Sequence, residues 1–570
     1  MTMLRRRITR GLGSSMALLL LAGCTRTETP SDPVATSDAG RPWFLESAGA
    51  AGIRFDHRSG HWKNRYLMPE IVCGGGALID YDGDGDLDVY LVQSGALEEP
   101  ERLDATNRLF RNRGDGTFED VSAGSGADVG GYGMGVATGD FDADGWMDLY
   151  ITNVGPNTLL HNRGDGTFED VSERAGVDDA AWGASAAFVD YDRDGDLDLF
   201  VANYIDWSIE TDVRCSSVSG APDYCSPMSY QAPAPDTLLR NDGDGTFTNV
   251  STDAGVHAAF GNGLGVVCGD FDGDDLVDIF VANDQTANQL WHNRGDGTFE
   301  DIAMVAGCAV DDRGEAKAGM GVTTEDFDGD GDLDLLVVNL TSQSDSFFRN
   351  EGSYFFDDTA SVGLGGDSRR YTRFGLGVMD FDNDGWLDIF HANGRVTKPA
   401  APDPLRSDDI FAEPNQVFAG GPGGRFAARP PLPDIQTSRA AAFGDVDGDG
   451  GIDILVVNRD GPAHLLRNVH VGRGRWLMLD VRHPNGAVAI GATVMLELGE
   501  RRLRREVRTA SSYCAANDHR VHFGLGSEAR IGDISVRWPD GVVESFGTRD
   551  ADRVWTLRRG EGVAVHGSAG

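Results

Sequence analysis

A nine-residue acidic pattern occurs seven times in this sequence and limits its architecture more than any other feature. The first copy runs from Asp80 to Asp88 and reads D-Y-D-G-D-G-D-L-D. Later copies recur at intervals of 50 to 80 residues and begin at Asp140, Asp190, Asp270, Asp326, Asp380 and Asp445. Each copy is followed at once by an apolar, β-branched run, such as V-Y-L-V after Asp88. A loop that leads into a buried strand, repeated in this way, predicts a repeat architecture.

The spacing of the carboxylates in this Asp loop suits a hard divalent cation. Calcium takes six to eight oxygen ligands at about 2.3–2.6 Å. Nine residues can surround one ion when the side chains at positions 1, 3, 5 and 9 and the backbone carbonyl at position 7 face inward. Glycine at position 6, which is Gly85 in the first copy, supplies the left-handed turn that lets the chain double back. The fourth copy has Asp275 there, and aspartate tolerates this conformation better than most residues.

We therefore predict about seven structural Ca²⁺ ions. Asp stands at positions 1, 3, 5 and 9 in all seven copies, which favours metal sites over the alternative of acidic surface turns, although Asp and Gly are frequent in turns. The predicted ligands are Asp80, Asp82, Asp84, Asp86, Asp88, Asp140, Asp142, Asp144, Trp146, Asp148, Asp190, Asp192, Asp194, Asp196, Asp198, Asp270, Asp272, Asp274, Leu276, Asp278, Asp326, Asp328, Asp330, Asp332, Asp334, Asp380, Asp382, Asp384, Trp386, Asp388, Asp445, Asp447, Asp449, Gly451 and Asp453.

A second pattern repeats in phase with the Asp loop. It reads L-L-H-N-R-G-D-G-T-F-E-D-V-S at 159–172, with further copies at 107–122, 238–251 and 289–302. Two β-rich runs that flank Asp-Gly predict a hairpin. With the strands before and after the Asp loop, this gives about four strands per repeat, the content of one propeller blade. The predicted fold is all-β, a seven-bladed β-propeller over residues 42–470.

Two segments lack a partner inside their own repeat. Phe44–Ile53 resembles the second strand of the hairpin, and no first strand precedes it. His464–Asn468 resembles a first hairpin strand, and no D-G-T-F follows it. We expect the two to pair and close the ring, because closure removes the edge strands of an open array.

The loop, strand and hairpin together resemble the FG-GAP or VCBS repeat family, whose calcium-bearing blades also occur in integrin α-chain heads. The resemblance covers about Phe44 to Asn468. It implies the propeller and its calcium loops, but this family serves adhesion, scaffolding and catalysis alike, so fold does not fix function.

After residue 470 the composition changes. Residues 475–558 lose the Asp loops, become rich in Arg and alternate between apolar and polar positions, which predicts a separate small β-sandwich over 471–560 followed by a tail at 561–570. The runs A-I-G-A-T-V (489–494), V-H-F-G-L-G (521–526) and V-R-W-P-D-G (536–541) resemble the ASPIC/UnbV domain. That domain accompanies these propellers in the cartilage acidic protein family and its bacterial relatives. The basic cluster 501–505 is expected to dock on the acidic propeller.

The N-terminus has the pattern of a processing signal. Basic residues 5–7 precede a short apolar region that ends in L-A-G-C, which resembles a bacterial lipoprotein signal with Cys24 as the lipidated residue. We expect a signal peptide at 1–23, a flexible tether at 24–41, and attachment to the outer membrane, on its periplasmic or its surface side, through the lipid alone. The formal charge of −42 without a basic stripe excludes nucleic acid as a partner.

Six cysteines follow Cys24. Export makes disulfides plausible, and we expect Cys215 to pair with Cys225 because both lie in one insertion. The other four, Cys73, Cys268, Cys308 and Cys514, allow three pairings, among which the sequence does not choose.

That insertion, 203–236, lies in the longest interval between Asp loops, and such loops are often binding loops or lids, although plain decoration is more common. A candidate ligand pocket precedes the first Asp loop. Its residues are His57, His61, Arg65, Tyr66 and Glu70.

Three functions remain open at this stage. The favoured one is a calcium-binding, lipid-anchored binding, recognition or adhesion protein, with an unknown protein, glycan or small-molecule ligand on the axial face of the propeller. The second is an enzyme with an active site on that face, acting on natural products or carbohydrates; no familiar catalytic motif supports it. The third is a structural surface scaffold.

Overall fold

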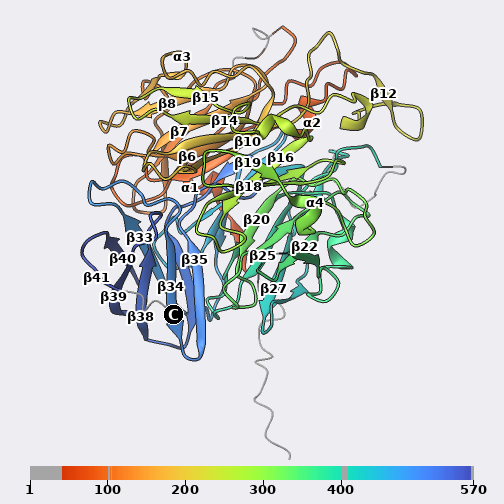
Figure 1. Ribbon diagram of the computed structural model, residues 1–570. Helices are drawn as coiled ribbons and strands as arrows, with labels where there is room; N and C mark the ends of the chain where they lie inside the picture. The colour runs from red at the N-terminus through yellow and green to blue at the C-terminus, as the bar shows by residue number, and fades with distance from the viewer. Residues whose placement is uncertain (1–41, 100–102, 104, 353, 400–408, 566–570) are drawn as a thin grey trace, which may run out of the picture. The chain divides into compact units, whose positions relative to one another are not determined.

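The computed structural model describes residues 42–99, 103, 105–352, 354–399 and 409–565 (Figure 1). The predicted signal peptide, Cys24 and the tether lie outside the described residues. No helix in the described ranges is long and apolar enough to cross a membrane.

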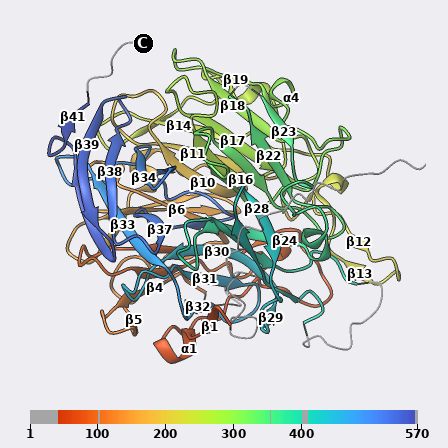
Figure 2. The same ribbon diagram turned by 90° about the horizontal axis from the view of Figure 1, so that it is seen from below.

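Seven antiparallel sheets repeat one strand order within the described chain. The first four consist of β2 (Gly76–Ile79), β3 (Asp88–Leu91), β4 (Arg108–Asn112), β5 (Phe118–Asp120); β6 (Gly133–Gly139), β7 (Asp148–Asn153), β8 (Thr158–Asn162), β9 (Phe168–Asp170); β10 (Gly183–Val189), β11 (Asp198–Asn203), β14 (Thr237–Asn241), β15 (Phe247–Asn249); and β16 (Gly263–Gly269), β17 (Asp278–Asn283), β18 (Gln289–Asn293), β19 (Phe299–Asp301). We number these sheets as blades 1 to 4, and Figure 2 shows blade 4 in green.

Blades 5 to 7 follow the same order. They consist of β20 (Val322–Glu325), β21 (Asp334–Val337), β22 (Ser346–Asn350), β23 (Phe355–Asp357); β24 (Arg373–Met379), β25 (Asp388–Asn393), β27 (Gln416–Gly421), β28 (Arg425–Ala428); and β30 (Ser438–Gly444), β31 (Asp453–Asn458), β32 (His464–Asn468), β1 (Phe44–Glu46). The first strands of consecutive blades contact one another in the order β2, β6, β10, β16, β20, β24, β30, and β30 contacts β2.

The pairing expected between the two unpartnered segments is confirmed. β1 pairs antiparallel with β32, and Phe44 lies opposite Asn468. Blade 7 therefore takes its fourth strand from the start of the described chain. The short helix α1 (Ala48–Ala51) follows β1, and α3 (Ser172–Ala175) and α4 (Ala303–Ala306) stand at the same point after blades 2 and 4.

Neighbouring blades are joined by a repeated aromatic contact and a repeated hydrogen bond. The aromatic residue at position 2 of an Asp loop packs on the hairpin phenylalanine of the next blade, as Tyr81 does on Phe168 at 6.0 Å between ring centroids. The hairpin asparagine of that next blade, Asn162, donates to the carbonyl of Tyr81 at 2.8 Å. Each contact has one exception: Gly420 replaces the hydrogen-bonding asparagine in blade 6, and Val446 replaces the aromatic residue at position 2 in blade 7.

The C-terminal region forms two sheets, as the sandwich prediction requires. One contains β37 (Val521–Gly526), β33 (Arg475–Arg482) and β40 (Arg553–Arg558); the other contains β35 (Arg501–Glu506), β34 (Thr493–Leu498), β38 (Arg530–Arg537), β39 (Val543–Asp550) and β41 (Val563–Ala564). These strands are drawn in blue in Figure 1. Trp538, between β38 and β39, is buried in a hydrophobic cluster that also contains Tyr90 and Leu149 of the propeller.

Part of the C-terminal region also reaches into the propeller. Residues 509–518, which we call the axial segment, contact the first strands of several blades. Its strand β36 (Ala515–Ala516) pairs in parallel with β2. Ser512 exchanges backbone hydrogen bonds with Val322 of blade 5, and its hydroxyl donates to the Ala441 carbonyl of blade 7.

The tip of the axial segment is buried. Tyr513 packs edge-on against Phe374 of blade 6 and donates its hydroxyl hydrogen to the Val72 carbonyl at 2.5 Å. The Cys514 amide donates to the Ser185 hydroxyl of blade 3 at 2.9 Å. The segment therefore occupies the space at which the first strands of the blades meet.

Candidate functional site

The Asp loops all lie on one face of the propeller. Each joins the first strand of a blade to the second, and the hairpin turn joins the third to the fourth, so both fall at the same end of antiparallel strands. We call this end the Asp-loop face. The remaining connections, including the 203–236 insertion, fall at the opposite end, which we call the connection face.

The position-9 aspartate fixes each Asp loop to its own hairpin. Asp88 is buried, and its Oδ1 accepts from the Asn112 amide at 2.7 Å while its Oδ2 accepts from the Tyr81 amide at 3.1 Å. The same two hydrogen bonds recur in all seven blades, with the amide of Gly420 replacing that of asparagine in blade 6. A carboxylate oxygen has two lone pairs, so each retains one for a cation.

The carboxylates at positions 1 and 5 shape the turn. In the first loop the amide of Gly85 donates to Asp80 Oδ2 at 3.0 Å, and the amide of Asp86 donates to Asp84 Oδ1 at 2.9 Å. The position-5 hydrogen bond is present in every loop. Carboxylate oxygens of positions 1, 3 and 9 in blade 1, and of positions 1, 3 and 5 in blades 2 and 3, lie within 4.8 Å of one another.

The electrostatics of these loops favour a bound cation. Burial, together with the neighbouring carboxylates, raises the pKa of Asp88 to about 8 and that of Asp140 to about 7. Burial likewise raises the pKa of Asp334 to about 8. Each loop gathers negative charge where water is partly excluded, and a divalent cation would neutralise it. Because the donors are carboxylates, the set fits the oxygen preference of Ca²⁺.

The C-terminal sandwich contacts the Asp-loop face at position 6 of the loops. Arg520, Arg504 and Arg501 donate to the carbonyls of Gly85, Gly331 and Gly385 in blades 1, 5 and 6. The predicted docking of the basic cluster is therefore confirmed for Arg501 and Arg504, and for Arg505, which lies 3.8 Å from Glu325 of blade 5. Arg502 instead contacts Met495 within the sandwich.

The one loop without glycine at position 6 is explained by this contact. Asp275 has a φ of 75°, in the left-handed region, and its carboxylate lies 2.5 Å from Arg537 of the sandwich. The side chain that breaks the glycine pattern thus forms an ion pair with the sandwich.

On the connection face, part of the candidate ligand pocket comes together. His61 Nδ1 lies 2.7 Å from Glu70 Oε2, and Glu70 belongs to the short helix α2 (Pro69–Val72). The ring of Tyr66 lies 4.7 Å from that of His61. Arg65 instead forms an ion pair with Glu98, and His57 hydrogen-bonds to Ser94 through Nε2 at 3.0 Å. Burial lowers the pKa of His57 to about 4, so its imidazole is neutral.

The insertion supplies a further member of this cluster. Tyr224 donates to Glu70 Oε2 at 3.2 Å and accepts from Arg459 Nη1 at 3.2 Å. Lys398 donates through Nζ to the Tyr66 hydroxyl at 2.6 Å, and its amide donates to Asp223 Oδ2 at 2.9 Å. We call His61, Tyr66, Glu70, Tyr224, Lys398 and Arg459 the connection-face cluster. Burial raises the pKa of Glu70, and the hydrogen bonds from His61 and Tyr224 oppose that shift.

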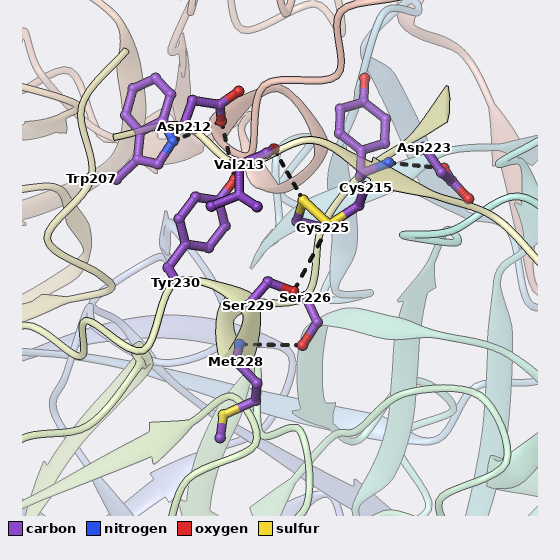
Figure 3. Close-up of a disulfide and its surroundings, with 11 residues drawn as sticks. Trp207, Asp212, Val213, Cys215, Asp223, Cys225, Ser226, Met228, Ser229 and Tyr230 are labelled. Carbon is purple, nitrogen blue, oxygen red and sulfur yellow. Dashed lines mark hydrogen bonds between the residues drawn. A yellow bond between two sulfur atoms is a disulfide. The ribbon is translucent and has the colours of Figure 1, made fainter. Parts of the chain in front are cut away.

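The disulfide predicted within the insertion is present. Cys215 and Cys225 form a disulfide. Cys215 belongs to β12 (Cys215–Ser216), which pairs with β13 (Pro222–Asp223) in a two-stranded sheet. Trp207 and Tyr230 both donate to Asp212 Oδ1, at 3.0 and 3.1 Å, and fix the base of the loop (Figure 3). Cys73, Cys268, Cys308 and Cys514 are free thiols within the described part of the chain, so none of the three pairings forms.

Several of these residues were missed from the sequence. Lys398 and Arg459 belong to no repeated motif, and nothing in their local sequence marks them. Tyr224 lies in the insertion that was a candidate binding loop, but its contact with Glu70 was not predicted. The axial segment did leave a signal in the first strands of the blades. A Cβ on Gly135 would lie 2.9 Å from Cys514 Cα, so this glycine allows the close approach of the segment.

Two family models match the chain. The model described as an FG-GAP-like repeat matches residues 80–151, 140–201, 220–281, 270–337 and 326–391, which together cover just over half of the 570 residues. The model described as ASPIC and UnbV matches residues 482–564. The seventh Asp loop lies outside the matched ranges.

Two curated relatives are each 30% identical to this chain over part of its length. Cartilage acidic protein 1 of Homo sapiens is 30% identical over 342 residues, which are 56% of this chain and 49% of that protein. The Xenopus tropicalis protein of the same name is 30% identical over 308 residues, 52% of this chain and 44% of that protein. The chain thus spans about half the length of the curated relatives it matches.

Among solved structures, a lectin of Agrocybe aegerita that recognises non-reducing terminal N-acetylglucosamine aligns with a TM-score of 0.37 and 16% identity, over 64% of this chain and 88% of that one. YCF48 bound to a D1 peptide aligns with a TM-score of 0.38 and 11% identity, over 71% of this chain and 94% of that one.

Proposed function

Because the chain belongs to the family of FG-GAP-like repeat proteins, we propose that it is a calcium-stabilised propeller that binds a partner at its connection face. Each Asp loop holds one Ca²⁺ through positions 1, 3, 5, 7 and 9, and the ion has a structural role. It ties the loop down at the point where the hairpin asparagine of the next blade and the arginines of the sandwich contact it.

The observation that carries the calcium proposal is the gathering of carboxylates in each Asp loop. Positions 1 and 9 are buried or partly buried, and burial raises the pKa of their carboxyls, as it does for Asp88 and Asp140. An ion bound only by the folded chain adds RT ln(1 + [L]/Kd) to stability, about 2.7 kcal/mol at a concentration 100 times Kd.

The test is calcium-dependent thermal unfolding of the chain, with ion content measured by mass spectrometry. About seven calcium ions per chain and a large fall in melting temperature on chelation are expected. Ion content far below seven, with melting unchanged by chelator, would overturn the proposal.

The recognition part of the proposal depends on the connection-face cluster. Four connections that are far apart in the sequence supply its members, and it combines cationic, anionic and aromatic groups in one place, as binding sites for polar ligands do. His61 keeps about 30% of its side chain exposed, whereas Glu70 behind it is buried. The Glu70 carboxylate thus orients an imidazole whose Nε2 remains for a ligand.

Recognition is tested with glycan and peptide arrays probed by the chain and by a double variant, His61→Ala with Tyr66→Ala. The proposal expects array signals that the double variant loses. The matched control is Arg65→Ala, which removes the neighbouring ion pair with Glu98 and keeps the cluster. Equal binding by all three proteins would place recognition elsewhere.

We propose Cys24 as the residue that carries the lipid anchor. Lipidation there would attach the protein to the outer membrane through the tether at 24–41. Cys24→Ala is expected to move the protein from the membrane fraction to the soluble fraction. A variant that stays in the membrane fraction would contradict a lipid anchor.

A further inference from the structure

Two of the seven Asp loops differ from the others in the hairpin residue that faces them. This residue stands immediately before the hairpin asparagine, or before Gly420 in blade 6. In chain order it is Arg111, His161, Arg240, His292, Arg349, Ala419 and Arg467. Histidine therefore occurs in blades 2 and 4 alone.

In blade 2 the histidine completes a three-residue cluster. His161 Nδ1 lies 3.5 Å from Asp142 Oδ2 and 3.4 Å from Asp148 Oδ1. The three atoms all lie within 4.8 Å of one another. The Nδ1 atom is buried, and both distances exceed the roughly 2.7–3.2 Å of an ordinary N–H···O hydrogen bond. A buried nitrogen thus faces two carboxylate oxygens, which belong to positions 3 and 9 of the loop.

Blade 4 repeats this geometry with different residues. His292 Nδ1 lies 3.3 Å from Asp272 Oδ2 and 3.3 Å from Asp278 Oδ1. These atoms form the same kind of cluster, and this Nδ1 is also buried. The same arrangement occurs in two separate segments of the chain. It is therefore a consequence of histidine at this position and not of an irregular backbone in one blade.

Blades 5 and 7 show what arginine does in the same place. Arg349 pairs with Asp328, and Arg467 pairs with Asp447, both of which are position-3 carboxylates. A guanidinium brings a permanent positive charge but has no lone pair to give a metal. A neutral imidazole has one, so histidine changes the donor set and arginine does not.

We propose that the Asp loops of blades 2 and 4 are mixed imidazole–carboxylate sites that bind a divalent transition metal, with Zn²⁺ as its probe, in preference to Ca²⁺. Imidazole nitrogen suits Zn²⁺, whereas Ca²⁺ prefers oxygen ligands alone. Bond lengths to zinc of about 2.1 Å place neighbouring ligand atoms of a tetrahedral site about 3.4 Å apart. The distances from His161 and His292 to their carboxylates match that spacing.

This inference rests on the proposed function to the extent that the zinc sites share carboxylates with the calcium loops. The experiment separates the two. The full chain is stripped with chelator, loaded with excess calcium, titrated with zinc, desalted, and analysed for both metals by mass spectrometry. We expect two zinc ions per chain, one for each histidine-bearing loop, with the loss of two calcium ions.

The variants His161→Arg and His292→Arg place in each loop the residue that blades 5 and 7 carry, so the fold is expected to persist. Each single variant loses one zinc ion, and the double variant loses both while its calcium-dependent melting remains. Cobalt substitution gives an independent signal, since visible absorption bands are expected from the chain and not from the double variant. His257→Gln is the control, because His257 contacts Thr252 outside every Asp loop.

Two results would overturn the inference. Failure to take up zinc while calcium binding persists would leave the proposed function standing and remove only the zinc sites. Zinc retained by the double variant would show that it binds elsewhere. If the chain bound neither metal, the calcium proposal would fail as well.

Discussion

The Asp loops and the axial segment both connect the blades, but they do so by opposite means. An Asp loop takes its predicted ligands from nine consecutive residues, and the same chemistry recurs seven times. The axial segment occurs once and contacts strands from most of the chain. The hydrogen bond from Tyr513 to Val72 joins residues 441 positions apart. Repetition fixes the geometry of each blade, whereas a single inserted segment fills the space that the blades share.

The axial segment and the Asp loops therefore stabilise the fold in different ways. The axial segment acts at any calcium concentration, because its contribution comes from burial and hydrogen bonding. The Asp loops contribute through an ion and therefore depend on calcium and on pH.

Tyr513→Ala is expected to lower the free energy of unfolding by about 3–5 kcal/mol, because it empties a fully buried aromatic site at the axis. Urea unfolding should show this loss equally in calcium and in chelator. Tyr513→Phe is the control: it removes only the hydroxyl that serves the Val72 carbonyl and should cost about 1–3 kcal/mol. A nearly neutral Tyr513→Ala would mean that the segment does not hold the blades together.

Asp190→Ala is expected to lower the melting temperature in calcium but not in chelator. It removes the position-1 ligand of blade 3, and the loss in calcium is bounded by the binding term, about 2.7 kcal/mol at 100 times Kd. The control is Asp178→Ala, an exposed aspartate outside the loops. Equal loss in calcium and in chelator would show that Asp190 does not act through the ion.

The pH dependence of the metal-free chain should differ in sign from that of an ordinary salt-bridged protein. The pKa of Asp88 is about 8 in the folded chain, above the unfolded value of about 3.9. Its stabilising contribution is therefore present below about pH 4 and is lost as the pH rises through 8. Asp334 follows the same rule. In chelator the melting temperature should fall between pH 5.5 and 8, because a carboxyl that is protonated only in the folded chain loses about 1.4 kcal/mol of stabilisation per pH unit in this range.

In calcium this fall should disappear, because the ion takes the place of the proton. The two melting curves are compared by calorimetry at several pH values. A metal-free chain whose stability rises across this range would contradict the assigned pKa shifts.

Asp275→Asn is expected to have the smallest effect. The carboxylate of Asp275 pairs with Arg537, but both side chains are about 40% exposed, and exposed pairs contribute about 0–1 kcal/mol. Asparagine keeps the tolerance for positive φ, so only the charge is tested. The loss should shrink further in high salt. A loss in the free energy of unfolding above about 1 kcal/mol that did not depend on salt would show that Asp275 stabilises the conformation of the blade 4 loop.

The sequence predicted the parts of this protein that are local and repeated. The Asp loops, the hairpins and the pairing of Phe44 with Asn468 could be read because each is defined by a short pattern. The Cys215–Cys225 disulfide was predictable because both cysteines lie in one insertion. By contrast, the contact of Tyr224 with Glu70 spans 154 positions and involves no motif.

The roles of His161 and His292 lie between these extremes. Both stand in the hairpin repeat, so an alignment of the seven copies would have shown that they replace arginine. Only the folded chain shows that this position faces the Asp loop. The sequence shows Asp275 as an exception to the glycine pattern. Its partner Arg537 belongs to the C-terminal sandwich, so no short sequence pattern connects the two residues.

The most direct test of the central claim is a crystal structure of the calcium-loaded chain with anomalous diffraction data. The account predicts an anomalous peak in each of the seven Asp loops, with oxygen ligands at about 2.3–2.6 Å from positions 1, 3, 5, 7 and 9. Empty Asp loops in a crystal grown at millimolar calcium, or peaks confined to other acidic surfaces, would contradict it.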